Sequence, residues 1–233
     1  MRKMFAAVSY RYSNIIRGLN AIGIKTIEVP AINGMTENYE SSHADMQVLR
    51  VEDKLFLLKD NDSFNKSVSE NTALKIIYTS EGINEFKYPE CVKLNIAVAG
   101  KNIIGNHRYT DKKIIYECKD YNFIEVSQGY AKCSSAIISD SAIITSDISI
   151  YNACVDNKID CLKIQSGYIE LCKRYGGFIG GSCFQLDDTL YFTGNIEQHP
   201  DYEAIRSFCL NYSVNIKSIV KDPLTDVGGV VII

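Results

Sequence analysis

The 233-residue sequence has no excess of basic charge and no long apolar run. Lysine and arginine number 25 and aspartate and glutamate number 28, so the net charge is −3. No basic field is therefore present to attract nucleic acid or anionic lipid. The longest apolar runs, such as residues 227–233, are far too short to cross a bilayer. We expect neither nucleic acid nor a membrane among the partners of this protein.

The sequence also lacks the spacings that mark common cofactor and metal sites. The phosphate-loop pattern G-x-x-x-x-G-K-[ST] does not occur, and the glycines of residues 176–181 do not have the order G-x-G-x-x-G. None of the eight cysteines forms a C-x-x-C pair or a zinc-type grouping with histidine. We expect no nucleotide cofactor and no metal ion.

A secretion signal is incomplete at the start of the sequence. Residues 1–8 are basic and then apolar, but the apolar stretch is short and Tyr10-Arg11-Tyr12 follows without a small-residue cleavage site. We therefore expect a cytoplasmic protein. In that compartment most of the cysteines are predicted to be reduced and buried.

What the sequence does contain is the composition of a folded protein and a regular alternation of two patterns. Hydrophobic residues make up 46% and charged residues 23%, which excludes disorder, collagen-like repeats and coiled coils. The first pattern is a pair of short apolar runs joined by an acidic or glycine turn, which predicts a β-hairpin. The predicted hairpins are 44–50 with 54–58, 92–98 with 102–105, 135–138 with 142–145, and 181–186 with 189–194.

The second pattern is an amphipathic helix followed by a strand. In residues 12–22, apolar side chains recur at helical spacing, Gly23 ends the helix, and strand alternation follows in 24–29. The predicted helix–strand pairs are 12–22 with 24–29, 63–72 with 74–78, 110–120 with 122–126, 148–157 with 159–164, and 200–212 with 214–219.

The hairpins recur at a nearly constant interval. They begin near Asp45, Val92, Ala136 and Gly181, at steps of 47, 44 and 45 residues. One more step reaches 226–233, which provides a single strand whose partner is predicted in 3–9. The spacing predicts one α/β domain over residues 1–233, a five-repeat ββαβ propeller whose ring is closed by pairing of the N- and C-terminal strands. The approximate repeats are 44–91, 92–134, 135–180, 181–225, and 226–233 together with 1–43. An irregular α+β domain with accidental spacing is the alternative.

Five ββαβ units in a ring describe the pentein, or α/β-propeller, superfamily, and this sequence resembles it. The resemblance is carried by residues 43–45, 176–181 and 226–229. The superfamily includes arginine and agmatine deiminases, dimethylarginine hydrolases and amidinotransferases. Residues 128–134 and 143–147, together with His199-Pro200-Asp201, make the sequence most similar to a bacterial branch that lacks the usual C-terminal catalytic cysteine.

The resemblance implies a cysteine nucleophile that attacks a guanidinium carbon, a histidine that carries protons, and carboxylates that hold the cation in a central channel. In the characterised enzymes the nucleophile lies shortly after a paired glycine near the C-terminus. Here that segment reads Gly228-Gly229-Val230-Val231-Ile232, without a cysteine. The usual deiminase or hydrolase chemistry therefore does not carry over directly.

His43 and Asp45 are the first candidate site residues. They open the first predicted hairpin two residues apart, so on a strand they would face the same side. The pair would bind a cationic group or transfer protons. Alternatively, the segment is a polar loop in which Asp45 accepts backbone N–H bonds.

Cys133 is the first candidate nucleophile and Cys183 the second. Cys133 occupies the same place in the third repeat, beside Lys132, whose ammonium would lower the thiol pKa if both side chains faced the channel. Adjacent strand residues face opposite sides, however, and burial as a small hydrophobic residue is the alternative for either cysteine. Asp226, before the terminal glycine pair, resembles a ligand-holding carboxylate or else caps a loop. We expect Asp45, Asp226 and Lys132 to bind the substrate.

Three functions fit these residues. The first is a cysteine-dependent amidinohydrolase or deiminase-like hydrolase acting on a small guanidino, amidino or related cation. The second is a non-catalytic binding or scaffold module of the same fold with a macromolecular partner, since a fold does not determine a function. The third is an interaction protein that uses its 15 tyrosines at an interface. The sequence leaves the oligomeric state open.

Overall fold

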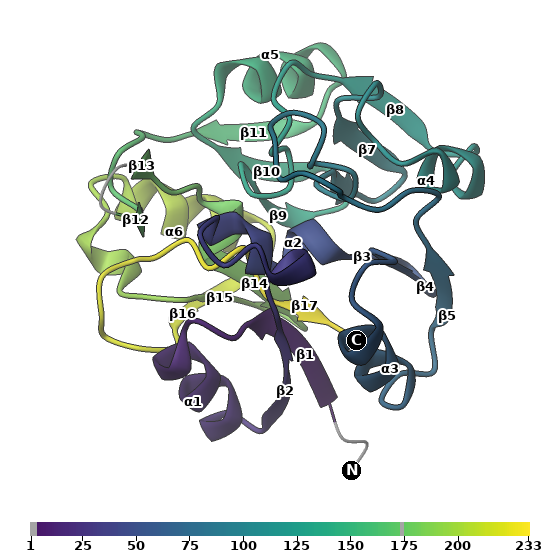
Figure 1. Ribbon diagram of the computed structural model, residues 1–233. Helices are drawn as coiled ribbons and strands as arrows, with labels where there is room; N and C mark the ends of the chain where they lie inside the picture. Colours follow the sequence, from purple (N-terminus) through teal and green to yellow (C-terminus); the bar gives the residue numbers. More distant parts are fainter. Residues whose placement is uncertain (1–3, 173–174) are drawn as a thin grey trace.

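Five three-stranded sheets and one small hairpin make up the β-structure of residues 4–172 and 175–233, the part of the chain that the computed structural model describes (Figure 1). All five sheets have the same order. A middle strand pairs antiparallel with one neighbour and parallel with the other. The middle strands are β1 (Met4–Ser9), β4 (Lys54–Leu57), β7 (Asn102–Gly105), β10 (Ala142–Thr145) and β15 (Thr189–Phe192).

The two outer positions of each sheet are equally regular. The antiparallel neighbours are β17 (Val231–Ile232), β3 (Val48–Val51), β6 (Ala97–Ala99), β9 (Ser135–Ser139) and β14 (Cys183–Leu186). The parallel neighbours are β2 (Ile24–Val29), β5 (Lys75–Tyr78), β8 (Asn122–Glu125), β11 (Asp160–Lys163) and β16 (Asn215–Ser218). The small hairpin is β12 (Glu170–Cys172) with β13 (Tyr175–Gly176).

A helix joins each middle strand to its parallel neighbour, because parallel strands need a crossover connection. These helices are α1 (Ser13–Ala21), α3 (Asp62–Ser69), α4 (Lys112–Glu117), α5 (Ile148–Asp156) and α6 (Tyr202–Asn211). In Figure 1, α1, α3, α4 and α5 lie at the rim of the molecule. Helix α1 buries Ile15 and Leu19, four residues apart, and Gly23 follows it at φ +87°. Among the described helices, none is long and apolar enough to cross a membrane.

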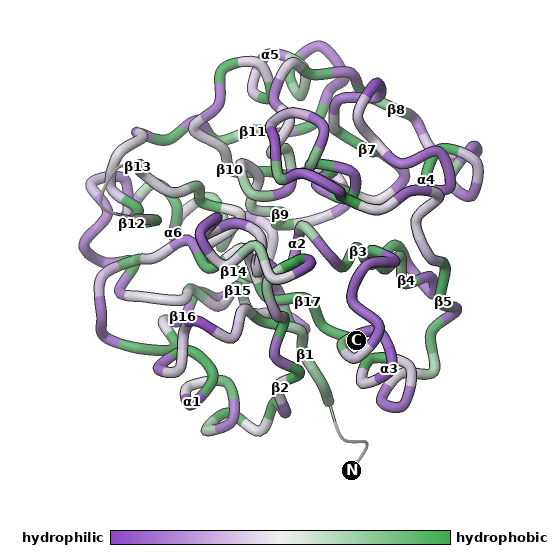
Figure 2. The backbone as a smooth tube through the Cα atoms, in the orientation of Figure 1, coloured by the Kyte–Doolittle hydropathy of each residue, from purple (hydrophilic) through white to green (hydrophobic). Residues whose placement is uncertain are grey.

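The antiparallel neighbours form the inner part of the molecule. Strand β9 contacts both β6 and β14, and β17 contacts β3. Strands β1 and β17 pair in register, with Ala6 opposite Ile232 and Ala7 opposite Val231. The sequence predicted this pairing from a strand starting at Lys3, a residue that lies outside the described part. In Figure 2 the chain is apolar along β17 and polar along much of the outer loops.

Several predicted strands are shorter in the structure: only Val231–Ile232 of 226–233 forms a strand, and the strand predicted from 181 begins at Cys183. Residues 44–47 form the helical turn α2 (Ala44–Gln47), and the strand begins only at Val48. Residues 92–96 form turns with Asn95 N–H donating to Val92, and strand β6 begins at Ala97. In both stretches polar and apolar residues alternate, but polar side chains such as Asp45 and Asn95 are buried as well as the apolar ones, so the alternation does not mark one face of a sheet. Short 3-10 turns also occur: η1 (Ile32–Gly34), η2 (Tyr39–Ser42), η3 (Gly180–Ser182) and η4 (Ile196–Gln198).

Helix α5 begins with a side-chain cap whose effect can be measured. Asp147 Oδ1 accepts the backbone N–H groups of Ser149 and Ile150 at 2.8 and 3.0 Å, and Gln128 donates to Oδ2 at 2.9 Å. Burial alone would raise the pKa of Asp147, but these hydrogen bonds outweigh burial and lower it. Replacing Asp147 with alanine is expected to lower the free energy of unfolding by about 1 kcal/mol at pH 7.

The loss should depend on pH. Because the folded-state pKa of Asp147 lies below its unfolded value, its charge stabilises the protein at neutral pH and stops doing so as the pH falls through that lowered pKa. Urea unfolding of the wild type and the Asp147→Ala variant should therefore differ more at pH 7 than at pH 3. Asp120→Ala, at an exposed position, serves as control. An equal difference at both pH values would contradict the capping role of the charged carboxylate.

Candidate functional site

Backbone hydrogen bonds bring together segments that are far apart in the sequence. The N–H of Gly181 donates to the carbonyl of Cys133 at 2.9 Å, and the carbonyl of Gly181 accepts the N–H of Gly229 at 2.8 Å. The N–H of Asp45 donates to the carbonyl of Gly228 at 3.0 Å. These bonds hold the starts of β3, β9 and β14 and the segment that precedes β17 close to one another.

Cys133 and Asp45 are in direct contact at this point. The thiol donates to Asp45 Oδ2 with a sulfur–oxygen distance of 2.8 Å, and both side chains are buried. Burial raises the pKa of Asp45 to about 7, although the ammonium of Lys132 opposes the shift. Burial and then the charge of Asp45 raise the pKa of Cys133 well above its usual value. The thiol therefore keeps its proton and shares it with the carboxylate.

Asn95 holds this pair in place, and the sequence did not identify it. Its Oδ1 accepts the backbone N–H groups of Lys132 and Cys133 at 2.9 and 3.2 Å, and its Nδ2 lies 3.2 Å from Cys133 Sγ. A fully buried amide must find such partners. An asparagine inside the apolar run 92–98 was the available signal.

His43 and Asp226 complete the cluster on the other side of Asp45. His43 Nδ1 lies 4.0 Å from Asp226 Oδ1, and the carboxylate accepts the backbone N–H groups of Phe178 and Gly228, both at 2.9 Å. Burial lowers the pKa of His43 to about 4, so the 4.0 Å contact joins a neutral imidazole to the carboxylate. Burial also raises the pKa of Asp226 to about 6, against the effect of those two hydrogen bonds.

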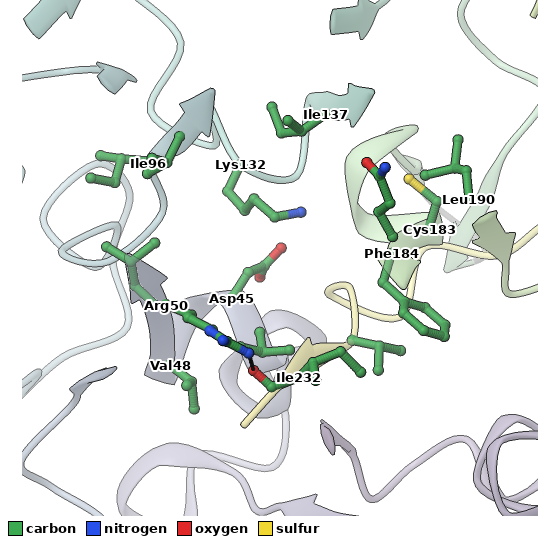
Figure 3. Close-up of a pocket in the computed structure, with 15 residues that line it drawn as sticks. Asp45, Val48, Arg50, Ile96, Lys132, Ile137, Cys183, Phe184, Leu190 and Ile232 are labelled. Atoms are coloured by element: carbon green, nitrogen blue, oxygen red, sulfur yellow. Dashed lines mark hydrogen bonds between the residues drawn. The ribbon is translucent and has the colours of Figure 1, made fainter. Parts of the chain in front are cut away.

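Lys132, Asp45 and Cys183 line a cavity of about 290 Å³ (Figure 3). The Lys132 ammonium donates to the carbonyl of Gly180 at 3.1 Å, and Figure 3 shows it pointing toward the Asp45 carboxylate. Burial raises the pKa of Cys183 to about 12. The remaining wall is largely apolar and consists of Val48, Leu49, Arg50, Ile96, Val98, Ile137, Phe184, Gln185, Leu190, Val230, Val231 and Ile232.

The structure thus places all six candidate residues in one region, but not in the way the sequence predicted. Asp45 lies on the helical turn α2 rather than on a strand. Lys132 and Cys133 lie in the turn before β9, where neighbouring side chains are not forced to opposite faces. Lys132, Asp45 and Cys183 line the cavity, whereas His43, Cys133 and Asp226 pack behind its wall.

Comparisons with known proteins agree with this architecture. Residues 7–231 match DUF6873, described as a family of unknown function. No curated protein matches the chain. DDAH from Pseudomonas aeruginosa, solved as a mutant complexed with citrulline, is similar in structure with a TM-score of 0.58 and 9% identity, over 99% of this chain and 98% of its own.

Two further solved structures are similar over most of the chain. The amidinotransferase SxtG from Microseira wollei has a TM-score of 0.55 and 12% identity, over 90% of this chain and 76% of its own. The agmatine deiminase of C. jejuni has a TM-score of 0.56 and 8% identity, over 94% of this chain and 87% of its own. At such low identities the likeness shows the fold alone. The resemblance to the pentein superfamily is confirmed at that level, and the chain belongs to the DUF6873 family.

Proposed function

We propose that this protein binds a small guanidino or amidino cation in the cavity beside Asp45, and that Cys133 acts on it as a nucleophile. The observation that carries the proposal is the buried contact of 2.8 Å between Cys133 Sγ and Asp45 Oδ2, next to His43 and at the wall of a cavity. The solved structures of similar fold are a dimethylarginine dimethylaminohydrolase, an amidinotransferase and an agmatine deiminase, which supports this ligand class.

The charge of the cluster supports a monovalent cation. Asp45 and Asp226 face a single ammonium, that of Lys132, since His43 is neutral and Cys133 keeps its proton. When both carboxylates are ionised, the buried cluster has one negative charge in excess. A bound amidinium or guanidinium neutralises it and can form paired hydrogen bonds with a carboxylate.

The chemistry that Cys133 can start is an attack on the amidino carbon. The thiol proton passes to Asp45 Oδ2 as the sulfur–carbon bond forms, and the same proton is then delivered to the leaving amine as the carbon–nitrogen bond breaks. His43, neutral and within the same cluster, is the group that can carry that proton. Water then hydrolyses the sulfur–carbon bond and returns the thiol.

A second candidate is binding without catalysis. It is supported by the position of Cys133, which packs behind the cavity wall while Asp45, Lys132 and Cys183 line it. Cys183, the other proposed nucleophile, contacts the cavity directly, so its reactivity decides the same question.

Ligand binding is tested by thermal unfolding with arginine, agmatine and methylated guanidines. Saturation at about 100 times the dissociation constant is expected to raise the melting temperature by on the order of 5 °C. Asp45→Asn should abolish the shift, and Asp187→Asn, at an exposed turn, should retain it. A shift that persists in the Asp45→Asn variant would place the ligand elsewhere.

Catalytic competence is tested by alkylation with a haloacetamidine, followed by peptide mass mapping. We expect one label per folded chain, on Cys133, and protection by a guanidine that gives a thermal shift. Cys118→Ala, in the buried core away from the cavity, should be labelled like the wild type. Labelling of Cys183 alone favours that residue as nucleophile, and no labelling before unfolding favours the binding function.

We also propose the finer architecture. The five sheets would be the blades of one α/β-propeller in a single domain over 1–233, with the pairing of β1 and β17 closing the ring and with the repeat boundaries predicted from sequence. The common strand order and a cavity lined from all five inner strands support it. The described free cysteines fit a cytoplasmic location, and we propose a small-molecule partner rather than nucleic acid.

A further inference from the structure

Three buried side chains of metal-binding type converge in this protein. One ligand atom each of His43, Asp45 and Cys133 can be chosen so that all three lie within 4.8 Å of one another, and the side chains are at most 3% exposed. Among residues 4–172 and 175–233, they form the one group of three such side chains. Cys133 is 88 residues from Asp45, far beyond the short spacings that mark a zinc site in a sequence, so the sequence predicted no metal site.

Several polar atoms of this trio have no hydrogen-bond partner within the described part of the chain. They are both ring nitrogens of His43 and Oδ1 of Asp45. A buried nitrogen or oxygen without a partner is unfavourable, and native structures rarely contain several in one place. The unprotonated ring nitrogen of a neutral imidazole and the carboxylate oxygen can each give an electron pair, so this cluster points to a ligand that accepts electron pairs.

The charge balance fits a divalent ion. If the thiol of Cys133 is deprotonated, the cluster holds one thiolate and the carboxylates of Asp45 and Asp226, against the ammonium of Lys132. A doubly charged ion neutralises the remaining excess. The cavity that Asp45 lines gives the ion a route to the trio.

The donor set selects the kind of metal. Imidazole, thiolate and carboxylate together suit Zn²⁺, which takes three protein ligands and an open fourth position in reactive sites. Asp226, 4.0 Å from His43 Nδ1, is placed to orient the imidazole, as outer carboxylates do for metal-bound histidines. Hard ions such as Mg²⁺ prefer oxygen ligands and fit this set poorly.

We propose that His43, Asp45 and Cys133 bind one zinc ion or another divalent transition metal of similar preference. Binding breaks the S–H bond of Cys133, forms a metal–sulfur bond and releases the proton to solvent, with no change of oxidation state. The proposal does not depend on guanidino binding. Because it engages the same thiol, the metal-bound protein resists alkylation at Cys133.

The test is a titration with Co²⁺, a spectroscopic substitute for Zn²⁺, on the full chain. We expect one ion per chain and a sulfur-to-cobalt charge-transfer band that Zn²⁺ removes. Cys133→Ser should lower the affinity by more than about 100-fold, beyond the loss seen when only an outer partner is removed. Cys118→Ala should bind as the wild type does. An unchanged band in the Cys133→Ser variant overturns the proposal.

A second measurement needs no variant. The X-ray absorption spectrum of the zinc-loaded wild type should show one sulfur ligand, with nitrogen or oxygen in the other positions. A spectrum with no sulfur ligand, or with two or more, would overturn the proposed ligand set. So would a failure to bind Zn²⁺ at micromolar concentration. A failure of guanidines to shift the melting temperature would leave these results unaffected, so the two proposals fail separately.

Discussion

Replacing Gly228 with alanine is expected to lower the free energy of unfolding by about 3 kcal/mol. Gly228 has φ +77°, a conformation that costs an L-residue about 1–2 kcal/mol. A Cβ there would also lie 2.1 Å from Cβ of His43, so the backbone or the imidazole must move. Since Gly228 bonds to both Asp226 and Asp45, such a shift also disturbs the two carboxylates.

Gly23 provides a matched control, because it has φ +87° but nothing within 4 Å of an added Cβ. Gly23→Ala should therefore lose only about 1 kcal/mol, the contribution of backbone conformation. Urea unfolding of both variants separates this contribution from the close contact with His43. If the two variants lost the same stability, the tight packing of His43 against Gly228 would be refuted.

The second large effect is expected at Lys132. Lys132→Met should lower the free energy of unfolding by about 2 kcal/mol at pH 8, where Asp45 and Asp226 are both charged in the folded protein. The ammonium is the positive charge that offsets both buried carboxylates, and methionine keeps the length of the side chain while removing that charge. Because Lys132 is only half-buried, the loss lies below that of a fully buried pair.

A double variant identifies the cause of that loss. In Lys132→Met/Asp45→Asn, one of the two carboxylates is neutral, so the double variant should be more stable than Lys132→Met alone. The exposed Lys119→Met substitution controls for loss of a positive charge in general and should stay within about 0.5 kcal/mol of the wild type. Additive losses in the double variant would show that Lys132 acts through packing alone.

The order of elements could be predicted because its signals are local. The hairpin of β9 and β10 has short runs of consecutive β-branched residues on either side of an acidic turn, and the structure matches the predicted segments to within a residue. Helix α1 has apolar side chains at helical spacing and a glycine after its end. Helix α1 buries one face, which is what periodicity detects, whereas β10 is buried on both faces and is recognisable from its apolar run beside a turn.

Residues 44–47 and 92–96 were predicted as strands and are not, because tertiary contacts decide their conformation. Met46 and Leu94 are fully buried, yet their neighbours Asp45 and Asn95 are fully buried too. Alternation of polarity then carries no information about a sheet face, because polar side chains in these turns are paired inside the protein. The hairpin of β12 and β13 was not predicted, because strands of three and two residues are too short to show a periodic pattern.

The sequence singled out the six candidate residues but not how they are arranged. Asp45 was predicted from its charge and Cys133 from its nucleophilic thiol. Asn95 is neutral and lies among mostly apolar residues, so it was not predicted. The distance between Cys133 and Asp45 depends on backbone bonds from Gly181 and Gly228, which no local pattern encodes. The lack of a cysteine after the terminal glycine pair remains the main difference from the chemistry that the resemblance implied.

The pairing of β1 with β17 has a consequence for how the protein is made. Ala6 cannot meet Ile232 until nearly all of the chain between them has been synthesised, which at about 5–20 residues per second takes the ribosome on the order of ten seconds or more. During that time Ala6, Ala7 and Val8, fully buried in the finished protein, have only the parallel strand β2 beside them. Strand β1 thus emerges long before its antiparallel partner β17, and in this interval it is a natural binding segment for chaperones and a site of aggregation.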